Sequence, residues 1–124
     1  MDSLDKQLFV QRKFFSLKGA LNFDEILRCG RRVTGSYVTV YVKNNEQKLI
    51  KLGIMVSKKV GKAVLRNKIK RWIREVVRSL TGHLPAGIDI LVVTKHHKAA
   101  YMNWPEIKQE LVELFIKLGY LTNE

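Results

Sequence analysis

The hydrophobic pattern of the chain is clearest between residues 57 and 80. Leu65, Ile69, Trp72, Val76 and Leu80 recur at intervals of three and four residues, which is the spacing of the buried face of an amphipathic helix. Basic side chains and Asn67 occupy the opposite side of the same predicted helix. The pattern therefore predicts a loop that leads into a long helix with one apolar and one cationic face, and the rest of the chain is organised around it.

Shorter patterns predict the elements before this helix. Asn22 and Glu25 have the spacing of a capping box, which predicts a short helix over Phe23–Cys29 that Gly30 ends. Residues 31–35 are read as a basic turn, and residues 1–20 as an extended arm or loosely packed leader.

Alternation of apolar and polar positions predicts the strands. Valines alternate with Tyr37, Thr39, Tyr41 and Lys43, which indicates a strand with two different faces. Residues 49–57 form a second β-rich run after a polar turn, and an antiparallel hairpin is the economical interpretation. Residues 88–94 predict a buried strand, and Pro105 and Gly119 bound a final helix. Helices and strands in this order indicate a single α+β domain over residues 1–124.

The charge of the chain indicates what kind of partner it binds. The chain has 23 Lys and Arg against 11 Asp and Glu, for a net charge of +12 and a pI near 10.0. Nine of these basic residues lie between Lys58 and Arg78, where the single acid is Glu75. A face kept only for solubility usually mixes charges so that they pair. An unbalanced basic helix instead favours a polyanion, and we expect nucleic acid.

Other features limit the cellular setting. A membrane surface is the main competing partner, but no apolar run approaches the ~20 residues of a spanning helix. The N-terminal residues lack the order of a signal peptide. Cys29 is the one cysteine and can form no internal disulfide. We therefore expect a cytoplasmic protein with no membrane partner.

Catalytic patterns are missing from the sequence. Gly61-Lys62 lacks the other residues of a phosphate-binding loop, and His96, His97 and Cys29 make no credible zinc ligand set. The acids form no paired constellation, and no nucleophile has a base beside it. We predict no catalytic residue and no metal or cofactor bound by the protein alone.

The segment from Val56 to Glu75 closely resembles the signature of the bacterial ribonuclease P protein subunit. Phe23 with Gly30, Tyr41, and residues 89–93 extend the resemblance across the chain. The resemblance implies a two-layer α/β sandwich of the ribosomal-protein-S5-domain-2-like type, with about four strands and a left-handed β-α-β crossover. Without the resemblance, the general preference of β-α-β units predicts a right-handed crossover.

The resemblance also implies an accessory subunit of a ribonucleoprotein endoribonuclease, which removes the 5' leader of precursor tRNA with a catalytic centre in the RNA. Divalent metal, with magnesium expected, would be used by the RNA. Leu27 departs from an aromatic residue often found in the family, and Lys68 from an arginine. The implied contacts with catalytic RNA are Lys58, Lys59, Lys62, Arg66, Asn67, Lys68, Lys70, Arg71 and Arg74. The implied leader cleft is lined by Phe23, Leu27 and Tyr41, with Lys59 at its edge.

Other classes remain open on sequence grounds. An RNA-binding protein of another assembly would explain the charge and the helix equally well, but would not depend on a leader. A DNA-binding protein is disfavoured because no compact helix-turn-helix pair precedes the basic helix, and no DNA partner is expected. A protein nuclease lacks grouped acids to hold metals.

Overall fold

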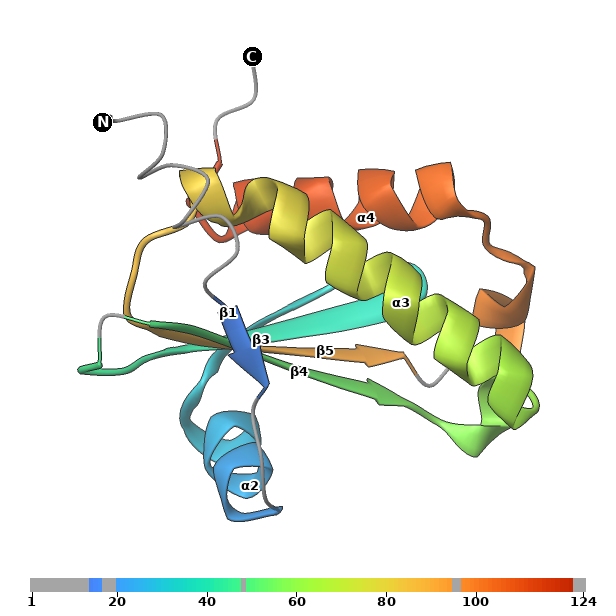
Figure 1. Cartoon of the computed structure of the whole chain (residues 1–124), viewed down its shortest axis with the longest axis horizontal. Helices are drawn as coiled ribbons and strands as arrows, with labels where there is room; N and C mark the ends of the chain where they lie inside the picture. The colour runs from blue at the N-terminus through green and yellow to red at the C-terminus, as the bar shows by residue number, and fades with distance from the viewer. Residues whose placement is uncertain (1–13, 17–19, 48, 95–96, 122–124) are drawn as a thin grey trace.

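The computed structural model describes residues 14–16, 20–47, 49–94 and 97–121 (Figure 1). A five-stranded mixed sheet has the strand order β1-β4-β5-β3-β2. Its strands are β1 (Phe14–Ser16), β2 (Arg31–Thr34), β3 (Val38–Asn44), β4 (Ile50–Val56) and β5 (Ile88–Thr94). The helices are α2 (Ala20–Cys29), α3 (Ala63–Leu80) and α4 (Trp104–Lys117), with short 3-10 turns η1 (Lys58–Val60), η2 (Thr81–His83) and η3 (His97–Tyr101).

The connection between β4 and β5 sets the topology. These strands are parallel neighbours, and α3 joins them by a crossover that Figure 1 shows to be left-handed, against the strong general preference for the right hand. The expected α+β class and left-handed crossover are confirmed. The four longer strands agree with the expected number of about four. β1 adds a three-residue fifth strand within the predicted arm, whose other residues up to 19 lie outside the described ranges.

The sheet carries helices on both faces, so α2 adds a smaller layer to the expected sandwich of sheet and helices. In Figure 1, α3 and α4 lie above the sheet and α2 lies below it. The larger core cluster joins α3 and α4 to one face of the sheet, and a smaller cluster of Ile26, Leu91 and Val93 joins α2 to the other. β5 is apolar on both faces, and an apolar strand needs cover on both.

The predicted hairpin is wrong. β5 lies between the two strands, antiparallel to β3 and parallel to β4. The predicted basic turn is also wrong in part, because residues 31–34 form β2, which pairs with β3. The carboxylate of Glu110 on α4 fixes the β2–β3 turn by accepting hydrogen bonds from the backbone N–H groups of Tyr37 and Val38, each at 2.8 Å.

Helix boundaries are partly as predicted. α4 begins with a capping box between Asn103 and Glu106 and is followed by Gly119 at φ 88°. α2 begins at Ala20, earlier than predicted, so Asn22 lies inside the helix and is not its cap. Gly30 follows the last residue of α2, as predicted, and only glycine fits there because a Cβ would lie 2.6 Å from the Ile26 carbonyl oxygen and 2.9 Å from that of Val42.

The buried face of α3 is rotated from the predicted stripe. The fully buried side chains are Ile69, Ile73, Val76 and Val77. Of these, Ile73 and Val77 are outside the predicted stripe. Leu65, Trp72 and Leu80 pack against the core but are only partly buried. The rotation also moves the basic side chains, and the site depends on it.

Candidate RNA-binding surface

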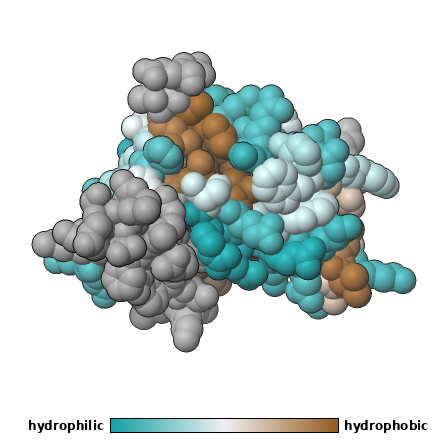
Figure 2. Space-filling model, turned by 45° about the horizontal axis from the view of Figure 1, so that its top comes forward, coloured by the Kyte–Doolittle hydropathy of each residue, from teal (hydrophilic) through white to brown (hydrophobic). Residues whose placement is uncertain are grey.

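The outer face of α3 carries a basic surface formed by Asn67, Lys68, Arg71 and Arg74, all of which are exposed. None of the basic side chains from Lys58 to Arg74 forms an ion pair with another described residue. Figure 2 turns the layer of α3 and α4 forward and shows a largely hydrophilic surface with a hydrophobic patch in its upper part. Unpaired cations at this density attract a polyanion, and Arg in particular presents a planar fork to phosphate.

Arg66 differs from the other basic residues because it also holds the loop before α3. It is partly buried, and its Nε donates to the Gly61 carbonyl oxygen at 3.0 Å. Gly61 has φ 157°, and a Cβ there would lie 2.8 Å from Leu65 Cδ2. The turn into the helix therefore needs glycine. Arg66 stabilises this turn in addition to any contact that it makes with RNA.

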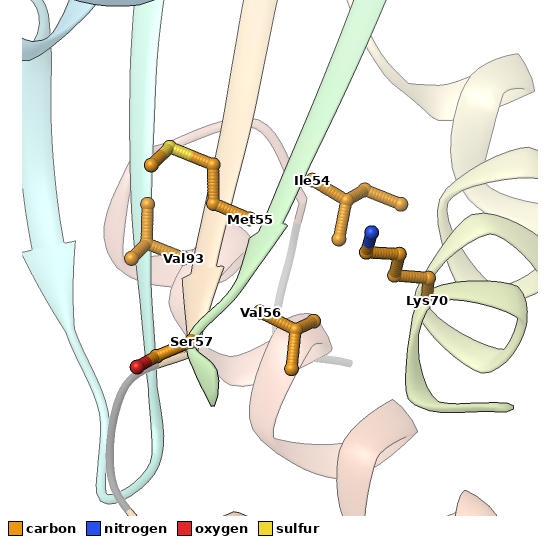
Figure 3. Close-up of a pocket in the computed structure, with 6 residues that line it drawn as sticks. All are labelled: Ile54, Met55, Val56, Ser57, Lys70 and Val93. Atoms are coloured by element: carbon orange, nitrogen blue, oxygen red, sulfur yellow. The ribbon is translucent and has the colours of Figure 1, made fainter. Parts of the chain in front are cut away.

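Lys70 lies on the inner flank of α3 and lines a hollow of about 490 Å³ at the end of β4. In Figure 3, Lys70 extends toward Ile54 and Val56, while Met55 and Val93 point to the opposite side of the sheet. β1 pairs with β4 only as far as Leu52, so the hollow lies where β4 continues beyond its short neighbour. No sequence pattern marks this hollow, because strand order creates it.

Lys68 lies at the edge of the outer face of α3, above Trp72. Its Nζ is 5.1 Å from the centroid of the indole ring, within the range of a cation–π interaction. Lys68 is exposed, so it can contact a phosphate while the ring restrains its position.

The turn between β4 and α3 presents further lysines. Ser57 caps η1 by accepting a hydrogen bond on its Oγ from Lys59 N–H at 3.1 Å, and its own N–H donates to the Thr94 carbonyl oxygen. Lys58, Lys59 and Lys62 are all exposed. This cationic turn follows the carboxyl end of β4, and the Ser57 hydrogen bond ties it to the end of β5.

The predicted cleft residues gather on the α2 face. Phe23 and Tyr41 are partly buried against the cluster of Ile26, Leu91 and Val93. Leu27 is 38% exposed and stays outside that cluster. Tyr41 shares its face with Thr39 and Lys43, and Lys43 is paired with Glu25 at 3.4 Å. Two partly exposed rings beside an exposed apolar side chain form a surface on which unstacked bases can be held.

The structure thus divides the predicted site residues between two faces of the sheet. The residues predicted to contact catalytic RNA lie on η1, the following turn and α3, and the predicted cleft residues lie on α2 and β3. Sequence reasoning missed Met55, which is 38% exposed on the cleft face. Its position in the β4 alternation marks the face but not the exposure.

The chain matches the ribonuclease P family model over residues 12–119. It is 33% identical over 111 residues to the ribonuclease P protein component of Geobacillus kaustophilus, covering 89% of this chain and 91% of the relative. It is 43% identical over 95 residues to that of Desulfosudis oleivorans, covering 77% and 78%. The solved structure of the Staphylococcus aureus RNase P protein superposes with a TM-score of 0.77 at 38% identity, covering 88% of this chain and 98% of that one. No helix in the described ranges has the length and apolarity needed to cross a membrane.

Proposed function

The chain belongs to the family of bacterial ribonuclease P protein components, and from this membership we propose that it binds the catalytic RNA with η1 and α3 and the 5' leader of precursor tRNA with the α2 face of the sheet. Membership itself makes the chain a subunit of an endoribonuclease with an RNA partner. The proposal concerns which surface meets which RNA.

The observation that carries the proposal is the separation of two chemically different surfaces. The α3 surface is cationic and has no described ion-pair partner, which suits the closely spaced phosphates of a folded RNA. The α2 face offers Phe23 and Tyr41 beside apolar side chains, which suits the unstacked bases of a single strand. The exposed lysines of η1 lie on the segment that joins β4 to α3, so one protein can hold leader and catalytic RNA together.

In this function the protein contributes binding rather than bond cleavage. The described residues bring together no group of three or more His, Cys, Asp or Glu side chains, and such groups are the usual protein ligands of a catalytic metal. The divalent metal that assists phosphodiester cleavage, with magnesium expected, would be held by oxygens of the RNA and the substrate.

Leader-dependent affinity tests the proposal. Phe23→Ala and Tyr41→Ala are assayed in reconstituted holoenzyme with two precursor tRNAs, one with a leader several nucleotides long and one with a single leader nucleotide. Each variant should lose about 1 to 3 kcal/mol of affinity for the long-leader substrate, because one stacking platform is removed, and little for the other. Tyr101→Ala removes a tyrosine that is 83% exposed on η3 and serves as the matched control.

Equal losses on both substrates would contradict the cleft assignment. Phe23 and Tyr41 would then serve the fold or the contact with catalytic RNA, while family membership would stand on its own evidence.

A further inference from the structure

Arg32 is an exposed cation on the edge strand β2. It lies directly opposite Tyr41 in the antiparallel pair of β2 and β3, and directly opposite residues place their side chains on the same face of a sheet. Arg32 therefore shares the α2 face with the proposed cleft. It forms no ion pair or hydrogen bond with another described residue.

Arg31, the neighbouring residue, is used differently. Its Nη2 donates to the Leu118 carbonyl oxygen at 3.0 Å, and its guanidinium lies 5.9 Å from the centroid of the Tyr120 ring. Arg31 thus joins β2 to the end of α4 on the opposite face. The two adjacent arginines divide into one that holds the fold and one that is available to a ligand.

Polar groups continue from Arg32 along the same face. Thr34 lies opposite Thr39, and the Thr39 hydroxyl donates to the Thr34 hydroxyl at 3.4 Å. Across β5 and β4 the same row of the sheet continues through Val93 to Met55, and β4 leads into Ser57 and the lysines of η1. The row runs from Met55 on β4, shortly before the lysines of η1, to Thr34 on β2, two residues after Arg32. Its two ends lie about 15 Å apart at the usual strand spacing.

We propose that Arg32, with the Thr34–Thr39 hydroxyl pair beside it, is a backbone-binding subsite for the single-stranded leader, so that the leader crosses the sheet from β4 to β2. Arg32 takes a phosphate, and the threonine hydroxyls take a ribose 2'-hydroxyl or a phosphate oxygen. The aromatic side chains then hold bases between two backbone contacts. This inference rests on the proposed function, because it assigns a further part of the same leader surface.

A competing explanation is that Arg32 only protects an edge strand from pairing with another chain. That role requires charge at the edge and no contact with leader. The two explanations differ in how an Arg32 variant responds to leader length.

The test measures substrate affinity of reconstituted holoenzyme carrying Arg32→Ala, Arg32→Lys or Arg28→Ala, with one long-leader and one single-nucleotide-leader precursor tRNA. Arg28 is an exposed arginine near the end of α2, and its replacement changes the net charge by the same amount. Arg32→Ala should weaken binding of the long-leader substrate about tenfold, the effect of removing one charge-assisted hydrogen bond. Arg32→Lys should recover part of this affinity, because lysine keeps the charge without the fork.

Arg28→Ala should behave as the unmodified protein on both substrates, and Arg32→Ala should leave affinity for the catalytic RNA unchanged. If Arg32→Ala and Arg28→Ala give the same result, or if the Arg32→Ala loss is equal on both substrates, the subsite does not exist. Phe23→Ala and Tyr41→Ala in the same assay separate the subsite from the proposed function. If these two variants lose affinity mainly for the long-leader substrate and Arg32→Ala does not, only the subsite is overturned. If none of the three variants responds to leader length, the proposed function is overturned.

Discussion

Single side chains on α3 separate packing from recognition. Trp72 is partly buried against the core, with Lys68 over its ring, whereas Ile73 is 0% exposed. The predicted stripe has Trp72 at its centre and leaves Ile73 out, but in the structure Ile73 is the more deeply buried of the two. The stability of the helix should follow burial, and recognition of RNA should follow the exposed cations.

Trp72→Ala should lower the free energy of unfolding by about 2 kcal/mol, less than the 3 to 5 kcal/mol typical of a fully buried tryptophan. Ile73→Ala should cost at least as much, about 2 to 5 kcal/mol, although its side chain is smaller. Urea denaturation measures both changes. The folded Trp72→Ala protein should bind catalytic RNA with near-normal affinity, and loss of binding at unchanged stability would place Trp72 in the RNA interface instead.

At the scale of the element, α3 divides into flanks and an outer face. Arg66 and Lys70 are partly buried on the inner flank, where Arg66 bonds to Gly61 and Lys70 lines the hollow beside β4. Arg71 and Arg74 are exposed. The exposed pair therefore gives the cleaner measure of phosphate binding.

Arg71→Ala and Arg74→Ala should each weaken binding to the catalytic RNA and reduce the slope of log affinity against log salt by roughly 0.7 to 0.9 for each phosphate that the variant no longer neutralises. Lys117→Ala is the control, because Lys117 is an exposed base on α4. Arg66→Ala should in addition lower stability, because it removes the hydrogen bond to Gly61. Salt slopes unchanged by both α3 variants would mean that RNA binds another face.

At the scale of the whole molecule, the proposed function makes this protein, with its net charge of +12, a link between two RNAs. It should cleave no precursor tRNA alone, because the described residues hold no cluster of His, Cys, Asp or Glu that could bind a catalytic metal. Protein and cognate catalytic RNA together should cleave it when a divalent metal is present. Cleavage that persists in preparations freed of RNA, measured by release of the leader, would contradict this division of labour.

The local elements are largely readable from the sequence. The strand at 88–94, the last helix with its Pro105 and Gly119 boundaries, and the long helix before them are confirmed. Each depends on short-range periodicity and end signals, which act within a few residues. The four-residue strand β2 has no such signal, because it is short and its two arginines favoured the interpretation as a polar turn. β2 forms because it pairs with β3.

The candidate surfaces can also be predicted in part from the sequence, because charge and aromatic content are properties of composition. The sequence determined that α3 is amphipathic and basic and that Tyr41 alternates away from the valines. The absence of catalytic residues stays a prediction. The family resemblance added the left-handed crossover and the assignment of the two faces to two RNAs.

Tertiary structure alone decided how these parts meet. Inserting β5 between β3 and β4 separates the expected hairpin, and the short strand β1 leaves the end of β4 beside a hollow. Packing against β4 and α4 turns α3 so that Ile73 and Val77 are buried and Arg66 lies on a flank. Pairing β2 with β3 puts Arg32 opposite Tyr41. Periodicity fixes which residues of one element share a face, but the rotation of a helix and the order of strands depend on contacts between distant segments, which no local pattern encodes.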